Sequence, residues 1–233
     1  MRVRWLGHSC FLITSGRGIK ILTDPYGKNV SYTLPKVAPD IVTLSHHHFD
    51  HNAHWRAEGK PRIVKRTSDF YEEHEVNVKG ENVKFKGIPT YHDTSLGKKK
   101  GPNTILVWGL DEISFCFLGD LGHIPSEKEY ETIGKVDVLF VPVGGLTTIA
   151  AKEAADIVNR LSPSIVFPMH FKTEFGGESL ANIVSDDVSI FLARMRDVRK
   201  LETDSFNFNP ADIKEASLEG TRVYNLTYIP SEE

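Results

Sequence analysis

Cysteine and long apolar runs are scarce in this sequence of 233 residues. The only cysteines, Cys10 and Cys116, each lie inside a short apolar run, so we expect two buried core residues and no disulfide framework. No apolar run approaches the roughly 18 residues that a membrane-spanning helix needs. The segment from Met1 to Leu6 reads as a strand and not as a secretory signal. These absences predict a cytoplasmic protein that has no membrane partner.

The sequence also lacks an excess of charge of either sign. It has 28 lysines and arginines against 31 aspartates and glutamates, a formal net charge of −3. This balance argues against attraction of the whole surface to nucleic acid, although a local basic patch is compatible with it. We therefore favour a small-molecule substrate over nucleic acid. The oligomeric state is open, and a homo-oligomer is compatible with the sequence.

Short strands dominate the first half of the chain, whereas strands and helices alternate in the second half. No linker, short repeat or low-complexity segment interrupts the pattern, so a single domain over residues 1–233 is expected. Strands are expected at residues 2–6, 10–14, 19–23, 41–44, 62–65, 83–88, 104–108, 113–118, 136–141, 164–168 and 221–229. Helices are expected from Ser126 to Ile133, around 154–161 and around 188–195.

The most informative segment is Ser45–His51, which follows the apolar run Asp40–Leu44. It reads H-x-H-x-D-H and places four potential metal ligands within six positions. Imidazole nitrogens and carboxylate oxygens are the ligands that zinc and its first-row neighbours accept. A polar loop rich in histidine is the alternative interpretation, and the density of ligands makes it much less favoured.

Three further candidate ligands, His92, Asp120 and His170, also come shortly after apolar strands. A sheet fixes the start of each such loop and leaves the tip of the loop accessible to substrate. Alone, each histidine would more often be a surface residue and the aspartate a turn former. Together with H-x-H-x-D-H they predict a composite metal site.

These motifs in this order resemble the metallo-β-lactamase superfamily. Trp5–Ser9, Thr23–Pro25, Gly119–His123, Pro142–Gly145 and Pro168–His170 narrow the resemblance to the branch that includes ascorbate-6-phosphate lactonase. The resemblance implies an α/β (α+β) fold, a four-layer αβ/βα sandwich in which helices flank two mixed sheets. It also implies that a dinuclear metal site lies between the sheets.

The same resemblance implies which residues hold the two metal ions. The first ion would be held by His46, His48 and His92, the second by Asp50, His51 and His170, and Asp120 would bridge them. Two divalent ions are expected, most simply zinc, although manganese, iron or nickel would also suit these ligands. Such a pair lowers the pKa of bound water towards about 7 and generates hydroxide at neutral pH. Asp50 and Asp120 are therefore the catalytic candidates, with Asp50 acting as a base or only orienting the nucleophile.

Several residues near these motifs are weaker candidates. Asp24 either orients a metal ligand or caps a turn before Pro25. His8 and His123 either contact substrate and the surroundings of the metals or are structural histidines. Lysines pair well with phosphate, so Lys172 and the run Lys98–Lys100 are candidates for binding a phosphorylated substrate, although such runs are usually solvated loops.

The expected function is hydrolysis of an ester, lactone or phosphodiester by metal-activated hydroxide. Two alternatives stay open: a metal-dependent ribonuclease or phosphodiesterase acting on RNA, and a non-hydrolytic metal-binding protein. The acidic net charge argues against the first of these. The chain has a suitable residue at every ligand position of the family pattern, which argues against a non-hydrolytic metal-binding protein.

Overall fold

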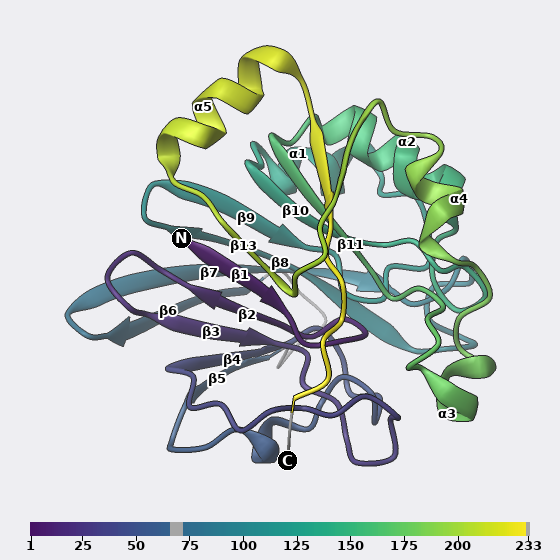
Figure 1. Cartoon of the computed structure of the whole chain (residues 1–233), viewed down its shortest axis with the longest axis horizontal. Coiled ribbons are helices and arrows are strands. Elements are labelled where there is room, and N and C mark those ends of the chain that lie inside the picture. The colour runs from purple at the N-terminus through teal and green to yellow at the C-terminus, as the bar shows by residue number, and fades with distance from the viewer. Residues whose placement is uncertain (66–71, 232–233) are drawn as a thin grey trace.

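Two mixed β-sheets form the centre of the protein (Figure 1). The computed structural model describes residues 1–65 and 72–231. Strand order in the first, six-stranded sheet is β13-β1-β2-β3-β4-β5. Its strands are β1 (Arg2–Trp5), β2 (Phe11–Thr14), β3 (Lys20–Thr23), β4 (Ile41–Leu44), β5 (Arg62–Lys65) and β13 (Ser205–Asn207).

The second sheet has eight strands in the order β12-β14-β11-β10-β9-β8-β7-β6. Its strands are β6 (Glu72–Val78), β7 (Glu81–Tyr91), β8 (Pro102–Leu110), β9 (Ile113–Phe117), β10 (Val138–Pro142), β11 (Ile165–Met169), β12 (Asp197–Lys200) and β14 (Arg222–Asn225). Antiparallel pairs run from β6 to β9 and parallel pairs from β9 to β12. The parallel strands β10 and β11 are buried along their whole length, as strands covered on both faces are.

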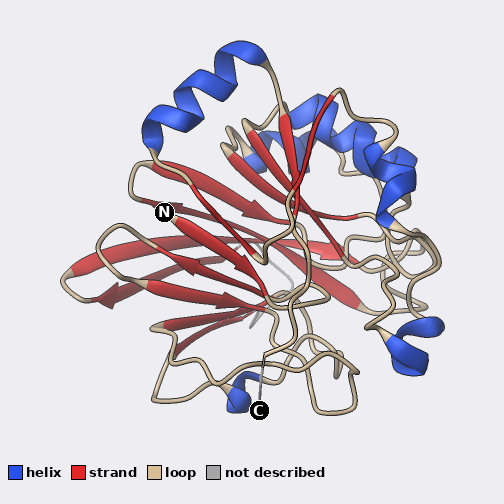
Figure 2. Ribbon diagram, viewed as in Figure 1, coloured by secondary structure: helices blue, strands red, loops and turns tan. Residues whose placement is uncertain are grey.

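Helices flank the sheets (Figure 2). They are α1 (Glu127–Ile133), α2 (Ala151–Leu161), α3 (Gly177–Ala181), α4 (Val188–Leu192), α5 (Pro210–Glu219) and the short 3-10 helix η1 (His54–Arg56). Helix α2 packs against β10 and α4, while α5 connects β13 of one sheet to β14 of the other. None of the described helices combines the length and apolar character that crossing a membrane requires.

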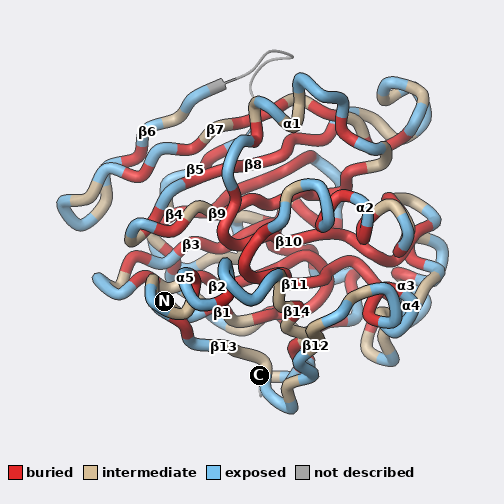
Figure 3. The backbone as a smooth tube through the Cα atoms, turned by 90° about the horizontal axis from the view of Figure 1, so that it is seen from above, coloured by how far each residue is buried: buried red, intermediate tan, exposed pale blue. Residues whose placement is uncertain are grey.

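Aromatic side chains join the two sheets in a shared core. The Phe11 ring of β2 lies 4.7 Å from the Phe140 ring of β10, which stacks on Phe167 of β11 at 5.4 Å. All three side chains are fully buried. Figure 3 shows that the backbone of β10 and β11 is buried as well. The sheets are therefore held face to face by apolar burial, which fixes how their edges lie relative to one another.

The structure confirms the expected α/β fold of two mixed sheets flanked by helices. Each expected strand and helix is present, most of them with shifted ends: the last predicted helix stops at Leu192, and the closing strand covers only Arg222–Asn225. The capping box between Ser126 and Glu129 opens α1 as expected. Cys10 and Cys116 are free and buried, also as expected.

Six elements are absent from the sequence prediction: the strands β6, β12 and β13, the helix α5, and the one-turn helices α3 and η1. The three strands lie at or near sheet edges and have mostly polar, half-exposed residues, so they lack the apolar alternation by which strands are recognised. Helix α5 buries only Ile213 and Ala216, which gives an equally weak helical pattern.

Candidate metal centre

The candidate ligands all follow the carboxyl ends of strands that point the same way within their sheet. In the first sheet β1, β3 and β4 run in one direction, and in the second sheet β7, β9 and β11 do so. Facing sheets thus deliver their loops to one shared edge. The residues delivered there are His8 after β1, Asp24 after β3, the 46–51 loop after β4, His92 after β7, Asp120 after β9 and His170 after β11.

The carboxylate of Asp120 lies at the centre of the cluster. Its Oδ2 atom is 3.0 Å from Nε2 of His92 and 3.0 Å from Nε2 of His170. The same oxygen is 3.3 Å from Nε2 of His51 and 3.9 Å from Nε2 of His46. One oxygen therefore faces four imidazoles that come from both sheets.

Three groups of potential ligands have ligand atoms within 4.8 Å of one another, and one of them, Asp24, His46 and His51, shares residues with the other two. The first group is His46, His48 and His92, and the second is His8, Asp50, His51 and His170. This division parallels the two triads that the family resemblance implies, with His8 added to the second.

A buried network around Asp24 orients two of the histidines. Asp24 accepts hydrogen bonds from Nδ1 of His51 at 3.0 Å, from the backbone N–H of Ser45 at 2.8 Å, and from the Ser45 hydroxyl. With its proton directed at Asp24, the Ser45 oxygen accepts from Nδ1 of His46 at 2.9 Å. His51 and His46 are thereby fixed with Nε2 as the lone-pair nitrogen.

His92 is oriented by the backbone. Its Nδ1 donates to the carbonyl oxygen of Thr147 at 2.9 Å, which leaves the Nε2 lone pair facing Asp120. Glycines permit this arrangement: a Cβ on Gly122 would lie 2.2 Å from the carbonyl carbon of His92, and one on Gly144 2.1 Å from the carbonyl oxygen of His170. The ligands from the second sheet are therefore positioned by close approach of main chains.

The arrangement has the polarity of a cation site. Three imidazoles direct Nε2 at a carboxylate oxygen, so a proton or a metal ion is needed between each nitrogen and the oxygen that it faces. Within the described residues, Nε2 of His46, Nε2 of His170 and Oδ1 of Asp120 are buried and have no hydrogen-bond partner. Buried polar atoms without a partner are costly, and a cation held by them would remove that cost, so the residues fit a metal ion.

The protonation tendencies of the cluster agree with this polarity. Burial by itself would raise the pKa of Asp120, but the adjacent His170 and His51 outweigh it and hold that pKa well below its usual range. Burial and then His51 lower the pKa of His46, which keeps its lone pair free. Burial acts against His51 and His92 too, yet the charge of Asp120 raises the pKa of His51 well above its usual range, and the hydrogen bond to Asp120 raises the pKa of His92. A metal ion binding at His92 would therefore displace a proton.

A cavity of about 320 Å³ opens beside the cluster. Its walls combine candidate ligands, apolar groups and two cations: His48, Phe49, Asp50, His92, Lys99, Lys100, Asp120, Thr147 and Ile183. The candidate ligands on its wall are thus within reach of a small molecule.

Asp93 shapes the loop that supplies the two lysines. Its carboxylate accepts backbone hydrogen bonds from Ser95, Gly97, Lys99 and Lys100 at 2.6–3.0 Å. Burial opposes the effect, but these bonds lower the pKa of Asp93 to about 2. Our sequence interpretation missed this residue, although Asp followed two positions later by Ser is a recognisable turn signal.

Two of the weaker candidates lie away from the cluster. His123 is half-exposed, and its ring nitrogens contact the Tyr91 backbone N–H at 3.4 Å and the Ile124 carbonyl at 3.0 Å. Lys172 is exposed and lines a different cavity, alongside Phe171. The structure brings neither residue to the candidate ligands, whereas it brings both His8 and Asp24 there.

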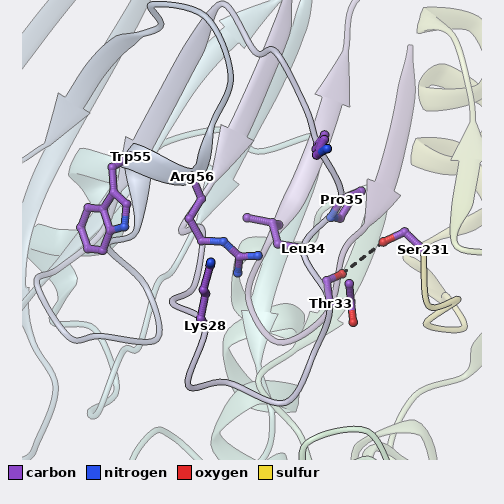
Figure 4. Close-up of a pocket in the computed structure, with 8 residues that line it drawn as sticks. Lys28, Thr33, Leu34, Pro35, Trp55, Arg56 and Ser231 are labelled. Atoms are coloured by element: carbon purple, nitrogen blue, oxygen red, sulfur yellow. Dashed lines mark hydrogen bonds between the residues drawn. The ribbon is translucent and has the colours of Figure 1, made fainter. Parts of the chain in front are cut away.

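A larger cavity of about 760 Å³ lies outside the cluster (Figure 4). Lys28, Lys36 and Arg56 contribute its charge, and the Trp55 side chain is largely exposed at its border. Among the described residues, no histidine or carboxylate lines it, so that part of the chain gives it none of the ligands that metal-dependent chemistry requires.

Comparison with known proteins relates this geometry to a family. The family described as "Beta-lactamase superfamily domain" matches residues 2–170. A UPF0173 protein of Pyrococcus furiosus is 33% identical over 194 residues, which cover 74% of this chain and 84% of that protein. A UPF0173 metal-dependent hydrolase of Thermococcus onnurineus is 27% identical, over 86% of this chain and 100% of its own length.

A solved structure agrees with the sequence comparisons. The crystal structure of a protein of the metallo-beta-lactamase superfamily from Thermotoga maritima superposes with a TM-score of 0.73 and 31% identity. The superposition covers 97% of each chain. Similarity in sequence and in fold thus extends well beyond the short motif at residues 46–51.

Proposed function

The chain belongs to the beta-lactamase superfamily, and from this premise we propose that it is a metal-dependent hydrolase of a small anionic ester, lactone or phosphodiester. The observation that carries the proposal is the position of the Asp120 Oδ2 atom, 3.0–3.9 Å from four imidazole nitrogens beside an open cavity. The resemblance to ascorbate-6-phosphate lactonase supports lactones within this class.

The residues that would hold two divalent cations are the two groups described above, with Asp120 between them. When bound, such cations lower the pKa of a water molecule and polarise the group to be cleaved. Zinc suits this histidine-rich and thiolate-free set, which also accepts manganese, iron or nickel. Carboxylate and imidazole ligands bind these ions deprotonated, so the low pKa values of Asp120 and Asp50 favour occupancy.

The protein's own side chains supply orientation and charge. Asp50 lines the cavity, and in the proposed reaction it would accept a proton from the attacking water or fix the direction of that water. Lys99 and Lys100 lie on the same wall and would pair with an anionic group of the substrate. Phe49 and Ile183 give the cavity an apolar side that suits the uncharged part of a small molecule.

The cavity also bears on the RNA-cleaving alternative. A space of about 320 Å³ suits a small molecule, and the chain has no excess of positive charge to hold a polyanion. A small-molecule substrate is therefore the stronger proposal. The free thiols of Cys10 and Cys116 are compatible with the cytoplasmic location proposed here.

The decisive experiment combines metal analysis with the variant Asp120→Ala. We expect about two ions per wild-type chain and hydrolysis of at least one member of a panel of phosphorylated lactones, phosphodiesters and carboxylic esters. Loss of Asp120 removes several kcal/mol of transition-state stabilisation, so the rate should fall by roughly 10³-fold or more. Circular dichroism checks that the fold is intact.

Asp156→Ala, on the exposed side of α2, is the matched control and should keep the wild-type rate. Hydrolysis by a metal-free preparation, or an unchanged rate in Asp120→Ala, would contradict the proposal. An oligoribonucleotide belongs in the panel, because preferential cleavage of it would favour the nuclease alternative.

A further inference from the structure

His8 is held in the cluster by an unusual backbone conformation. It follows β1 with φ of 52°, directly after Gly7 with φ of 100°. A non-glycine residue in this left-handed region requires support from its surroundings. The support comes from Trp5, whose indole N–H donates to the His8 carbonyl at 3.0 Å. The His8 ring is completely buried among the candidate ligands.

The distances between His8 and its neighbouring ligand atoms match those expected between atoms that bind the same cation. Its Nε2 lies 3.2 Å from Oδ2 of Asp50 and 3.2 Å from Nε2 of His51, and those two atoms are 3.5 Å apart. Two ligands at 2.0–2.1 Å from a tetrahedral zinc ion are separated by about 3.3 Å. All three separations fall close to that value.

A hydrogen bond explains only one of the His8 contacts. Nδ1 of His51 donates to Asp24, so Nε2 of neutral His51 is a hydrogen-bond acceptor. Each oxygen of ionised Asp50 is an acceptor as well. A proton on Nε2 of His8 can point at only one of these two acceptors. A single cation among Nε2 of His8, Nε2 of His51 and Oδ2 of Asp50 satisfies all three.

The two groups of ligands also differ in access. His48 and His92 of the first group line the cavity, whereas His8, His51 and His170 of the second group have no exposed surface and do not line it. Asp50, which is 2% exposed, is the one member of the second group on the cavity wall. A site in which protein ligands occupy every coordination position is typical of a structural metal ion. A site that keeps one position open is typical of a catalytic metal ion.

From this geometry we propose that His8 is a metal ligand of the second group, which with Asp50, His51 and His170 forms a closed site, while the first group forms the open one. This inference rests on the proposed metal-dependent function. It assigns unequal roles to the two sites: tight retention in the closed site, and contact with substrate at the open site beside the cavity.

The test measures metal binding and not turnover. Apo-protein is titrated with Co²⁺ and Zn²⁺ against a competing chelator, for the wild type, His8→Gln and His47→Gln. Glutamine keeps a hydrogen-bond donor that can reach Asp50 but is a poor metal ligand. His47 is an exposed histidine of the same motif and is the matched control.

We expect His8→Gln to weaken the tighter of two binding steps by about 100-fold or more, since even groups that only orient ligands contribute 10–100-fold. The visible spectrum of the first Co²⁺ ion should change as an imidazole is lost. His47→Gln should leave both steps and the spectrum unchanged.

Wild-type protein loaded with ¹¹³Cd provides a measurement that does not depend on the variant folding. Nε2 of His8 should couple to ¹¹³Cd in a ¹⁵N spectrum, together with five other imidazoles. Two bound ions without that coupling, or unaltered binding in His8→Gln, would overturn the assignment of His8 and leave the proposed function standing. A wild-type chain that binds no metal would instead overturn the proposed function.

Discussion

The two sheets contribute to the candidate metal centre in different ways. The six-stranded sheet supplies four of the candidate ligands from one loop of six residues, His46–His51, and orients two of them through the side chain of Asp24. The eight-stranded sheet supplies His92, Asp120 and His170 singly, from three separate strand ends.

The eight-stranded sheet also orients its ligands differently. His92 is held by the backbone carbonyl of Thr147. Gly122 and Gly144 lie in close contact with the main chain at His92 and His170. One half of the site thus depends on a buried side-chain network and the other on backbone packing. Loss of a single charge, such as that of Asp24, should therefore disturb the ligands of the six-stranded sheet. The ligands of the eight-stranded sheet should instead depend on how the sheets pack.

The contact between the sheets gives the largest expected effect. Phe140→Ala removes the ring that joins Phe11 to Phe167, and truncation of a fully buried Phe costs about 3–5 kcal/mol of unfolding free energy. Denaturant unfolding measures the change. We expect the midpoint to fall in one cooperative transition, with both halves of the metal site lost together.

Leu218→Ala is the control for that variant, because this side chain is 88% exposed and its loss should change stability by less than about 0.5 kcal/mol. Two separate unfolding transitions in Phe140→Ala would show that the sheets unfold independently. That result would contradict the dependence of the second half of the site on packing between the sheets.

Asp24→Asn tests whether the side-chain network of the six-stranded sheet orients its metal ligands. It removes the charged acceptor from His51 and Ser45 while preserving size, and orienting groups of this kind contribute about 10–100-fold to metal affinity. Competition with a chelator measures the loss. Asp40→Asn removes a carboxylate of the same sheet that bonds Lys20 N–H at 2.8 Å, outside the site, and should bind metal normally. Equal affinity in the two variants would refute the orienting role.

The smallest effect is expected at the cavity wall. Lys99→Ala and Lys100→Ala should each raise KM for an anionic substrate by roughly two- to fivefold, the usual value of an exposed charge pair, and leave kcat nearly unchanged. Steady-state kinetics at two ionic strengths checks this. Lys98→Ala is the neighbouring control, since Lys98 does not line the cavity. An equal effect on a neutral ester would argue against charge recognition.

Sequence patterns were sufficient for the strands that carry the site. Ile41–Leu44 is predicted with its observed limits because it is a continuous apolar run that is buried throughout. The limits of Arg62–Lys65 are also correct, although only Val64 of that strand is buried. Polar edge strands such as Ser205–Asn207 lack that signal, since pairing with a neighbour and not burial holds them in place. Asp93 was missed for a related reason, because its partners are backbone groups that any residue can supply.

His8 shows most clearly what residue order leaves open. The family motif places it near the site but leaves open whether it contacts substrate, surrounds the metals or is a structural histidine, and its neighbours in the chain say nothing about Asp50 or His51. Only the packed strands show its Nε2 at 3.2 Å from both. His123 was an equally good candidate by motif, and the structure places it beside Tyr91.

By itself the sequence determined the kind of chemistry, because the types of side chain and their spacing in H-x-H-x-D-H are local and set which ions the loop can bind. The tertiary structure alone decided which distant residues complete the site, which nitrogen each histidine presents, and which ligands face the cavity. Those properties depend on two sheets packing face to face through a shared apolar core, a long-range event that no short stretch of sequence encodes.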